Sequence, residues 1–282
     1  MKITVLIENH TARPEDGLAA EHGLSLHIEH QGVSVLFDTG ASGDFAANAE
    51  RLGVDLSAVD IAVVSHHHFD HGGGLPAFFA VNDHAPVYLR PPPDGSPVFH
   101  ALAVMNRDIG LPDGLVENHA ERFVFVEEPL EPFSGLFVID RVRKQHPVPG
   151  GNRYLYLEKD GRRENDPFDH ELMLVARSQE GLVVFTGCSH SGVLNMIETV
   201  MELFPGERIA AVVGGFHLVG FPLFDTMSGG RAQVRKVGNA LSALPVNHYW
   251  TGHCTGGRAY GVLQEILGDR LSRLNTGTTI EL

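Results

Sequence analysis

The sequence predicts a layered α/β fold in which sheets are covered by helices. Apolar, strand-like runs repeatedly end in glycine, serine, histidine or aspartate, as in VSVLFDTG, LVVFTG and AAVVGGFH. Strand-like and helix-like patterns alternate through the second half of the chain, which is typical of sheets that pack against helices. Leu24, Leu26 and Ile28 alternate with polar neighbours, as expected of a sheet with one buried face.

The first half of the chain begins with strand patterns. Residues 2–9 read as one strand, and residues 24–40 read as two strands joined by a turn at Gln31 and Gly32. Residues 45–54 are predicted to form a short helix. The apolar run in residues 60–66 then predicts a strand whose end delivers a group of histidines, and a helix is expected to begin near Pro76.

The segment that follows lacks such regularity. RPPPDGSPV, at residues 90–98, is a stiff, proline-rich interruption. From there to about residue 150 the pattern stays irregular, so this segment is predicted to be an insertion or cap within a single domain of residues 1–282.

The second half returns to regular alternation. Residues 171–187 predict two strands around a Gln-Glu-Gly turn, and residues 192–204 place apolar side chains at helical spacing. The remaining predictions are a hairpin at 153–163, strands at 208–218 and 247–256, and helices at 229–244 and 260–271.

Composition excludes several classes of protein. The formal net charge is −14 over 282 residues, and such a surface repels nucleic acid. A small-molecule substrate is expected instead, and an anionic or phosphorylated one would need local positive charge. Two cysteines make no disulfide framework. No apolar run approaches the roughly 18 residues of a membrane span, and the N-terminal sequence lacks a signal-peptide pattern, so a cytoplasmic protein is predicted.

The stretch SHHHFDHGGGL concentrates metal-binding side chains. His66 and His68 are two residues apart, so on an extended strand end they point the same way. Asp70 continues that series and His71 turns aside, so one loop can supply two neighbouring metals. A solvated polar loop is the alternative, but the apolar run before it and the glycines after it favour a metal site for zinc, iron or manganese. His67 falls between these positions and is expected to be exposed.

This stretch resembles the H-x-H-x-D-H signature of the metallo-β-lactamase superfamily, and VLFDTG, with Asp38, is similar to an upstream strand and turn of that superfamily. EHGLSLHIE, GCSHSGVLNM, GGFHL and GHCTG resemble one branch of it. That branch, labelled dihydropteroate-synthase-like, includes the ribofuranosylaminobenzene 5'-phosphate synthase of methanopterin biosynthesis.

The resemblance implies an αββα sandwich with two divalent metal ions, zinc above all, between two mixed sheets. It assigns one metal to His66, His68 and His190, and the other to Asp70, His71 and His253. Members with this architecture often self-associate, so the resemblance also allows a homo-oligomer.

Other residues follow from the same motifs. Many members carry a metal-bridging aspartate where this chain has Cys188, which is either an extra ligand or a small buried residue. Cys254 is expected to be structural. His217 ends a strand and is expected to contact substrate or donate a proton. The substrate-binding candidates are Glu21, His22, Ser189 and Thr255.

Three functions remain open from the sequence. The first is a hydrolase in which a metal-bound hydroxide, oriented by Asp70, attacks a phosphate ester, thioester or lactone. The second is a metal-dependent transferase that displaces diphosphate from a pterin-methyl diphosphate, as the resemblance implies. The third is a non-catalytic metal-binding sensor, which the complete set of His66, His68, Asp70 and His71 disfavours.

Overall fold

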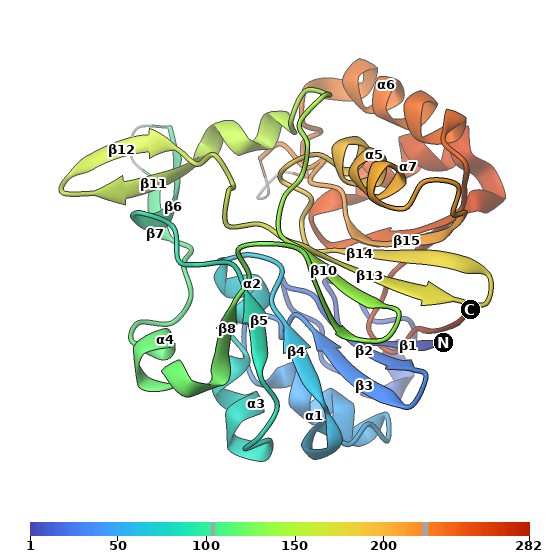
Figure 1. Cartoon of the computed structure of the whole chain (residues 1–282). Coiled ribbons are helices and arrows are strands. Elements are labelled where there is room, and N and C mark those ends of the chain that lie inside the picture. Colours follow the sequence, from blue (N-terminus) through green and yellow to red (C-terminus); the bar gives the residue numbers. More distant parts are fainter. Residues whose placement is uncertain (103–104, 222–224) are drawn as a thin grey trace.

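Two seven-stranded mixed sheets, stacked face to face, form the centre of the fold (Figure 1). This computed structural model describes every residue except 103–104 and 222–224. Helices cover the outer face of each sheet, so the layers follow the order helix, sheet, sheet, helix (Figure 1). The predicted αββα arrangement of two mixed sheets flanked by helices is confirmed.

The first sheet comes from the N-terminal part of the chain and one C-terminal strand. Its outer face is covered by α1 (Asp44–Arg51) and α3 (Leu75–Val81). The strands from β3 to β8 run parallel, and those from β18 to β3 run antiparallel. The strand order is β18 (Thr279–Glu281), β1 (Lys2–Ile7), β2 (Ser25–His30), β3 (Val33–Phe37), β4 (Ile61–Val63), β5 (Val87–Leu89) and β8 (Phe123–Phe125).

The second sheet has a similar plan. Its outer face carries α5 (Val193–Leu203), α6 (Gly230–Ala243) and α7 (Gly257–Leu267) (Figure 1). The strands from β14 to β17 are parallel, and the others are antiparallel. The strand order is β17 (Leu271–Arg273), β16 (Val246–Gly252), β15 (Ile209–Gly215), β14 (Gly181–Thr186), β13 (Met173–Ser178), β10 (Leu136–Ile139) and β9 (Leu130–Phe133).

Apolar side chains fill the space between the sheets. Val5 and Phe37 from the first sheet pack with Phe185 and Val213 from the second, and the rings of Phe37 and Phe185 lie 6.1 Å apart. Separate apolar clusters join each sheet to its own helices. Burial on both faces explains why the parallel strands read as continuous apolar runs.

A third, four-stranded sheet projects from this sandwich (Figure 1). Its strand order is β12 (Arg162–Asn165), β11 (Leu155–Lys159), β6 (Ser96–Ala101) and β7 (Met105–Asp108). The expected cap therefore has different bounds, because residues 90–150 also supply β8, β9 and β10 to the two main sheets. These strands span only three or four residues, too few to give a periodic pattern.

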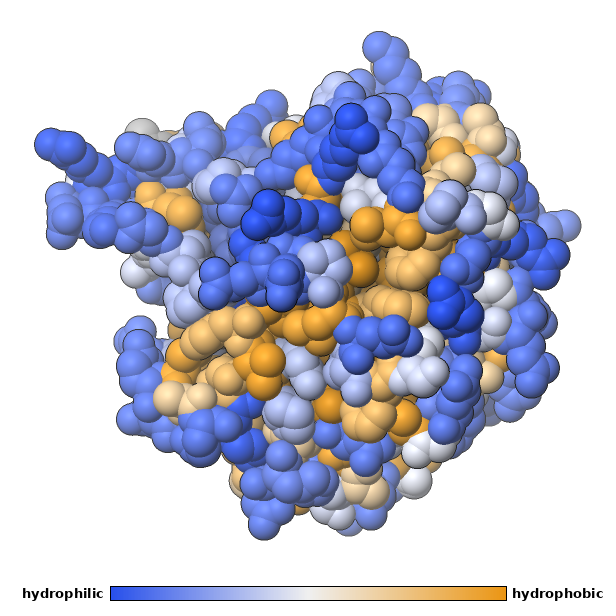
Figure 2. All heavy atoms as spheres, in the orientation of Figure 1, coloured by the Kyte–Doolittle hydropathy of each residue, from blue (hydrophilic) through white to orange (hydrophobic). Residues whose placement is uncertain are grey.

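The remaining elements are short. They are helices α2 (Phe69–Gly72) and α4 (Leu115–Asn118) and 3-10 turns, including Gly150–Tyr154 and His253–Thr255. Within the described residues, the helices are too short or too polar to cross a membrane. Figure 2 shows hydrophobic residues across the middle of the face where β8 and β10 lie in Figure 1, and Phe125 and Phe133 on the outer strands are exposed.

Candidate metal centre

The candidate site is built by loops that follow parallel strands of both sheets. Ser65 to His71 follows β4, and Cys188 to His190 follows β14. His217 follows β15 and His253 follows β16. Since the carboxyl ends of parallel strands meet at one edge of a sheet, these loops converge between the two sheets.

The first cluster contains His66, His68 and His190. One nitrogen of each ring lies within 4.8 Å of the others. His66 Nε2 and His68 Nδ1 are 3.1 Å apart, and His190 Nε2 is buried with no hydrogen-bond partner among the described residues. Ring nitrogens that converge in this way, shielded from water, fit a metal ion between them.

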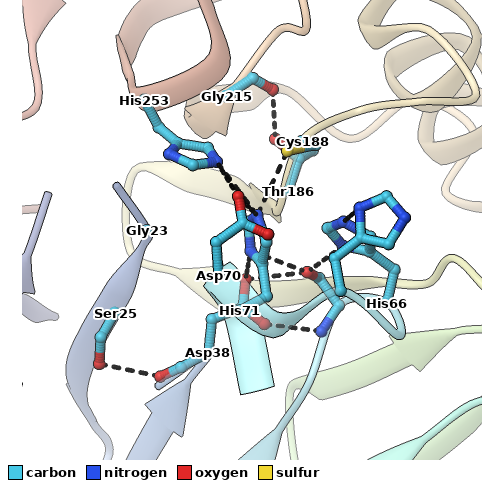
Figure 3. A network of polar contacts seen from close by, with 12 residues as sticks. Gly23, Ser25, Asp38, His66, Asp70, His71, Thr186, Cys188, Gly215 and His253 are labelled. Atoms are coloured by element: carbon cyan, nitrogen blue, oxygen red, sulfur yellow. Dashed lines mark hydrogen bonds and ion pairs between the residues drawn. The ribbon is translucent and has the colours of Figure 1, made fainter. Parts of the chain in front are cut away.

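The second cluster contains Asp70, His71, Cys188 and His253 (Figure 3). His71 Nε2 lies 3.2 Å from both Cys188 Sγ and His253 Nε2. Asp70 Oδ2 lies 3.3 Å from His253 Nε2 and 3.9 Å from His71 Nε2. The donors are therefore two imidazoles, a carboxylate and a thiol, a set that suits zinc.

Neighbouring oxygens fix the orientation of three of these rings. In each ring, Nδ1 contacts a carboxylate or amide oxygen, so Nδ1 carries the proton and the lone pair of Nε2 faces the cluster. The pairs are His71 with Asp38 at 2.7 Å, His190 with Asn152 at 3.2 Å and His253 with Asn9 at 3.0 Å.

Burial also keeps the first cluster in its ligating form. Burial lowers the pKa of His66 and His190 well below the ordinary value and lowers the pKa of His68 to about 3. Neutral imidazole is the form that binds a metal. All three rings are therefore ready to ligate at neutral pH.

The second cluster has a different electrostatic balance. Burial alone would lower the pKa of His71, but Asp38 and Asp70 outweigh it and raise this pKa to about 9. Burial would raise the pKa of Asp70, but His71, His22 and His253 hold it well below its usual range. The carboxylates that favour a proton on His71 favour a metal cation in the same place.

The comparisons with known proteins agree with this geometry. A family model described as the metallo-beta-lactamase superfamily matches residues 20–198, more than half of the chain. The chain belongs to the metallo-β-lactamase superfamily.

The similar proteins include a synthase and a hydrolase. The chain is 26% identical over 276 residues to a 7,8-dihydropterin-6-methyl-4-(beta-D-ribofuranosyl)-aminobenzene-5'-phosphate synthase of Methanocaldococcus jannaschii, covering 93% of this chain and 90% of that protein. An uncharacterized protein of the same organism is 30% identical over 225 residues, covering 77% of this chain and 80% of that one. Tm1679, a metal-dependent hydrolase of the beta-lactamase superfamily, has a crystal structure with 31% identity and a TM-score of 0.81, over 100% of this chain and 99% of that one.

Two buried glutamates hold the ligand loops, and sequence reasoning missed both. Glu171 accepts hydrogen bonds from the backbone N–H groups of His190 and Ser191, each at 2.7 Å. Glu8 accepts from the backbone N–H groups of His253 and His10, and burial raises the pKa of Glu8 to about 7. Glu8 directly follows the apolar strand β1, and this position at a strand end is the same sequence signal that identified the candidate histidines.

Of the four substrate candidates, His22 is the one that lines the pocket described below. Its Nε2 lies 3.2 Å from Asp70 Oδ2. Glu21 instead accepts backbone hydrogen bonds from Ala41 at 2.9 Å and Ser42 at 3.1 Å, so it shapes the turn after β3.

The hydroxyl groups of the other two candidates form hydrogen bonds with the backbone at the end of β15. Ser189 Oγ donates to the Gly215 carbonyl at 2.6 Å, and Thr255 Oγ1 accepts from the Phe216 N–H at 3.0 Å. Both side chains are buried and absent from the lining of the pocket. The sequence placed them near the motif, but the strand backbone takes up their hydroxyls.

His67 also differs from expectation, because it is buried rather than exposed. Its Nε2 lies 2.8 Å from the Arg90 carbonyl, and its backbone N–H donates to His170 Nδ1 at 3.3 Å. Burial lowers the pKa of His67 to about 3. Its neighbour His170 pairs with Asp166 at 3.0 Å. His67 itself belongs to neither of the two clusters.

A pocket of about 660 Å³ opens above both clusters. His68, Asp70, Cys188 and His190 contribute to its floor, together with His217. The ring of His217 lies 4.2 Å from that of His190, and among the described residues its buried nitrogens have no hydrogen-bond partner of ordinary geometry. The structure therefore places His217 beside the first cluster, with one ring nitrogen within 4.8 Å of the donor atoms of Cys188 and His190.

Proposed function

We propose that this protein is a hydrolase that holds two divalent transition-metal ions in the two clusters. The observation that carries the proposal is the pair of adjacent, buried donor sets at the floor of one pocket. Metal ions there would polarise a phosphoryl or carbonyl oxygen and lower the pKa of water. A phosphate ester, thioester or lactone is the proposed substrate.

In the proposed arrangement each ion has its own set of donors, and no carboxylate bridges the two ions. His66, His68 and His190 would hold one ion. The other would be held by Asp70, His71, His253 and Cys188. Since Cys188 stands where many superfamily members have a bridging aspartate, its thiolate would bind the second ion, and sulfur favours zinc over manganese.

Two side chains would act directly on the reacting groups. Asp70 stays ionised in the buried site, so its carboxylate can accept a hydrogen bond from the attacking water and orient it. His217 lies beside the first cluster and lines the pocket, so it would donate a proton to the leaving group.

A metal-dependent transferase is the second candidate. The relative from Methanocaldococcus jannaschii is a synthase, and the similarity covers nine-tenths of both chains. The same donors would hold metal ions whose charge would bind the diphosphate of a pterin-methyl diphosphate and assist its departure. Release of diphosphate from such a substrate, with an aromatic acceptor present, would identify this reaction.

Elemental analysis of the purified protein, followed by a substrate panel, tests the proposal. We expect about two equivalents of zinc and hydrolysis of a model lactone, thioester or phosphodiester.

His217→Gln should lower kcat about 100-fold, as for the loss of a general acid. The control is His146→Gln, because His146 pairs with Glu198 outside this pocket and should keep full activity.

Two results would contradict the proposal. Absence of stoichiometric transition metal in the protein would remove both the hydrolase and the transferase. Stoichiometric metal without turnover in either assay would instead favour a metal-binding sensor.

A further inference from the structure

The pocket above the clusters has an apolar wall that the proposed chemistry does not use. We call the apolar wall the six residues Phe69, Phe99, Met105, Ile109, Leu155 and Phe221. Three of them come from the projecting third sheet, which therefore helps to enclose the site. A pocket of about 660 Å³ has the size of an ordinary small-molecule site.

Aromatic rings give this wall a fixed shape. The ring of Phe99 lies 5.9 Å from that of Phe221 and 6.0 Å from that of Tyr154. Phe69 and Phe99 also pack against the small apolar cluster of Ile109, Leu155 and Phe168. Rings held in this way offer faces and edges on which a flat aromatic ligand can stack.

Arg107 adds positive charge to this apolar pocket. It lies on β7, directly opposite Phe99 in the register, and lines the pocket. Its guanidinium lies 4.8 Å from the centre of the Phe69 ring, and among the described residues no carboxylate pairs with it. In a chain of net charge −14, such an arginine is available to an anion from outside.

We propose that the substrate carries a flat aromatic body, which packs on the apolar wall, and an anionic group, which Arg107 binds. The substrate's reacting group then faces the two clusters at the floor. This inference rests on the proposed function for the reacting group. It assigns specificity to the third sheet, and in particular to Arg107.

The experiment measures binding of aromatic anions to the metal-loaded protein by calorimetry. The probes are 2,6-naphthalenedicarboxylate, with an anion at each end, and 2-naphthoate, with only one. We expect the wild-type protein to bind the dicarboxylate about tenfold more tightly, as for one charge-assisted interaction. Arg107→Ala should abolish this preference, and Arg107→Lys should restore part of it because the charge is kept.

Arg162→Ala is the matched control. Arg162 is another exposed arginine of the third sheet, but it does not line the pocket, so its loss should leave the preference unchanged. An unchanged preference in Arg107→Ala would overturn the assignment of Arg107. Adipate, a flexible dianion without an aromatic ring, tests whether binding needs the flat aromatic body. If adipate bound as tightly as 2,6-naphthalenedicarboxylate, the proposed packing of an aromatic body on the apolar wall would be overturned.

These outcomes are separable from those of the proposed function. Metal content and hydrolysis of the small neutral lactone γ-butyrolactone in the wild-type protein report on the centre alone. Absence of both bound metal and lactone hydrolysis in the wild-type protein would refute the proposed function, independently of the result for Arg107. Where an aromatic anionic substrate is turned over, Arg107→Ala should raise KM about tenfold and leave kcat within about twofold, a split that general loss of structure would not give.

Discussion

Asp38 determines which nitrogen of His71 faces the second cluster. Its carboxylate lies 2.7 Å from His71 Nδ1 (Figure 3). It also accepts hydrogen bonds from the backbone N–H and the hydroxyl of Ser65. A carboxylate can only accept, so the proton of the neutral ring must sit on Nδ1. The lone pair of Nε2 then points at the donors that would share the metal.

Asp38→Asn should reverse this arrangement at nearly constant volume. The amide can keep the bond from the Ser65 backbone with its oxygen and turn its NH₂ group toward His71 Nδ1. The ring then carries its proton on Nε2, where a ligand lone pair is needed. If the second cluster holds a metal ion as proposed, we expect the affinity for that ion to fall about 10- to 100-fold, measured by competition with a chelator.

The control for this prediction is Asp60→Asn. Asp60 also accepts a backbone hydrogen bond, from Ser34 at 2.8 Å, but on the surface and away from the clusters. The Asp60→Asn protein should bind metal as tightly as wild type. Equal metal affinity in Asp38→Asn and wild type would show that Asp38 does not set the tautomer of His71.

Single residues also show where sequence reasoning reaches its limit. His66, His68, Asp70 and His71 could be predicted because one short loop carries them at a specific spacing. Glu8 could not be paired with His253, because 245 residues separate them and a single glutamate carries no motif. Such contacts depend on how the two sheets stack, which residue spacing does not encode.

Element by element, long and periodic segments were predicted well and short ones were not. The predicted helix at 229–244 is α6, and the predicted strands at 171–187 are β13 and β14. Strands of three or four residues between 120 and 140 were missed, because tertiary pairing rather than local pattern makes them strands. The extent of the cap was therefore misjudged.

The loop between β14 and α5 depends on a residue from another element. Glu171 precedes β13, is buried, and accepts the N–H groups of His190 and Ser191. Glu171→Ala leaves two buried donors without partners, which should lower the free energy of unfolding by about 3 kcal/mol. Urea denaturation measures this loss, and weaker metal binding by the first cluster should accompany it.

Glu202→Ala provides a matched comparison. Glu202 pairs with Arg143 on the surface, so its removal should cost at most about 1 kcal/mol. A Glu171→Ala protein as stable as Glu202→Ala would mean that the loop keeps its conformation without the buried carboxylate.

At the scale of the whole molecule, the centre exists only when both sheets are in contact. The first sheet supplies His66 to His71, and the second supplies Cys188, His190 and His253. Neither half holds a full set of donors. Metal binding should therefore stabilise the contact between the sheets, because an ion that binds only the assembled site shifts the folding equilibrium.

The histidines buried in the folded chain also link its stability to pH. Burial lowers the pKa of His67 and His68 to about 3, whereas the unfolded chain takes up these protons near pH 6.5. The unfolded state then binds more protons as the pH falls, so stability is lost from about pH 6.5 downward. His71, with a raised pKa of about 9, contributes stability that is full below pH 6.5 and is lost as the pH rises through 9.

We therefore expect His67 and His68 each to lower the free energy of unfolding of the metal-free protein by about 2 kcal/mol between pH 8 and pH 5, while His71 and Glu8 offset part of this loss. Urea denaturation at both pH values measures it. His67 lies outside both clusters, so His67→Phe should reduce the dependence by about 2 kcal/mol, whereas replacing the exposed His84 with glutamine should not. If His67→Phe kept the full dependence, His67 would have to be protonated in the folded state, against the burial that its contacts impose.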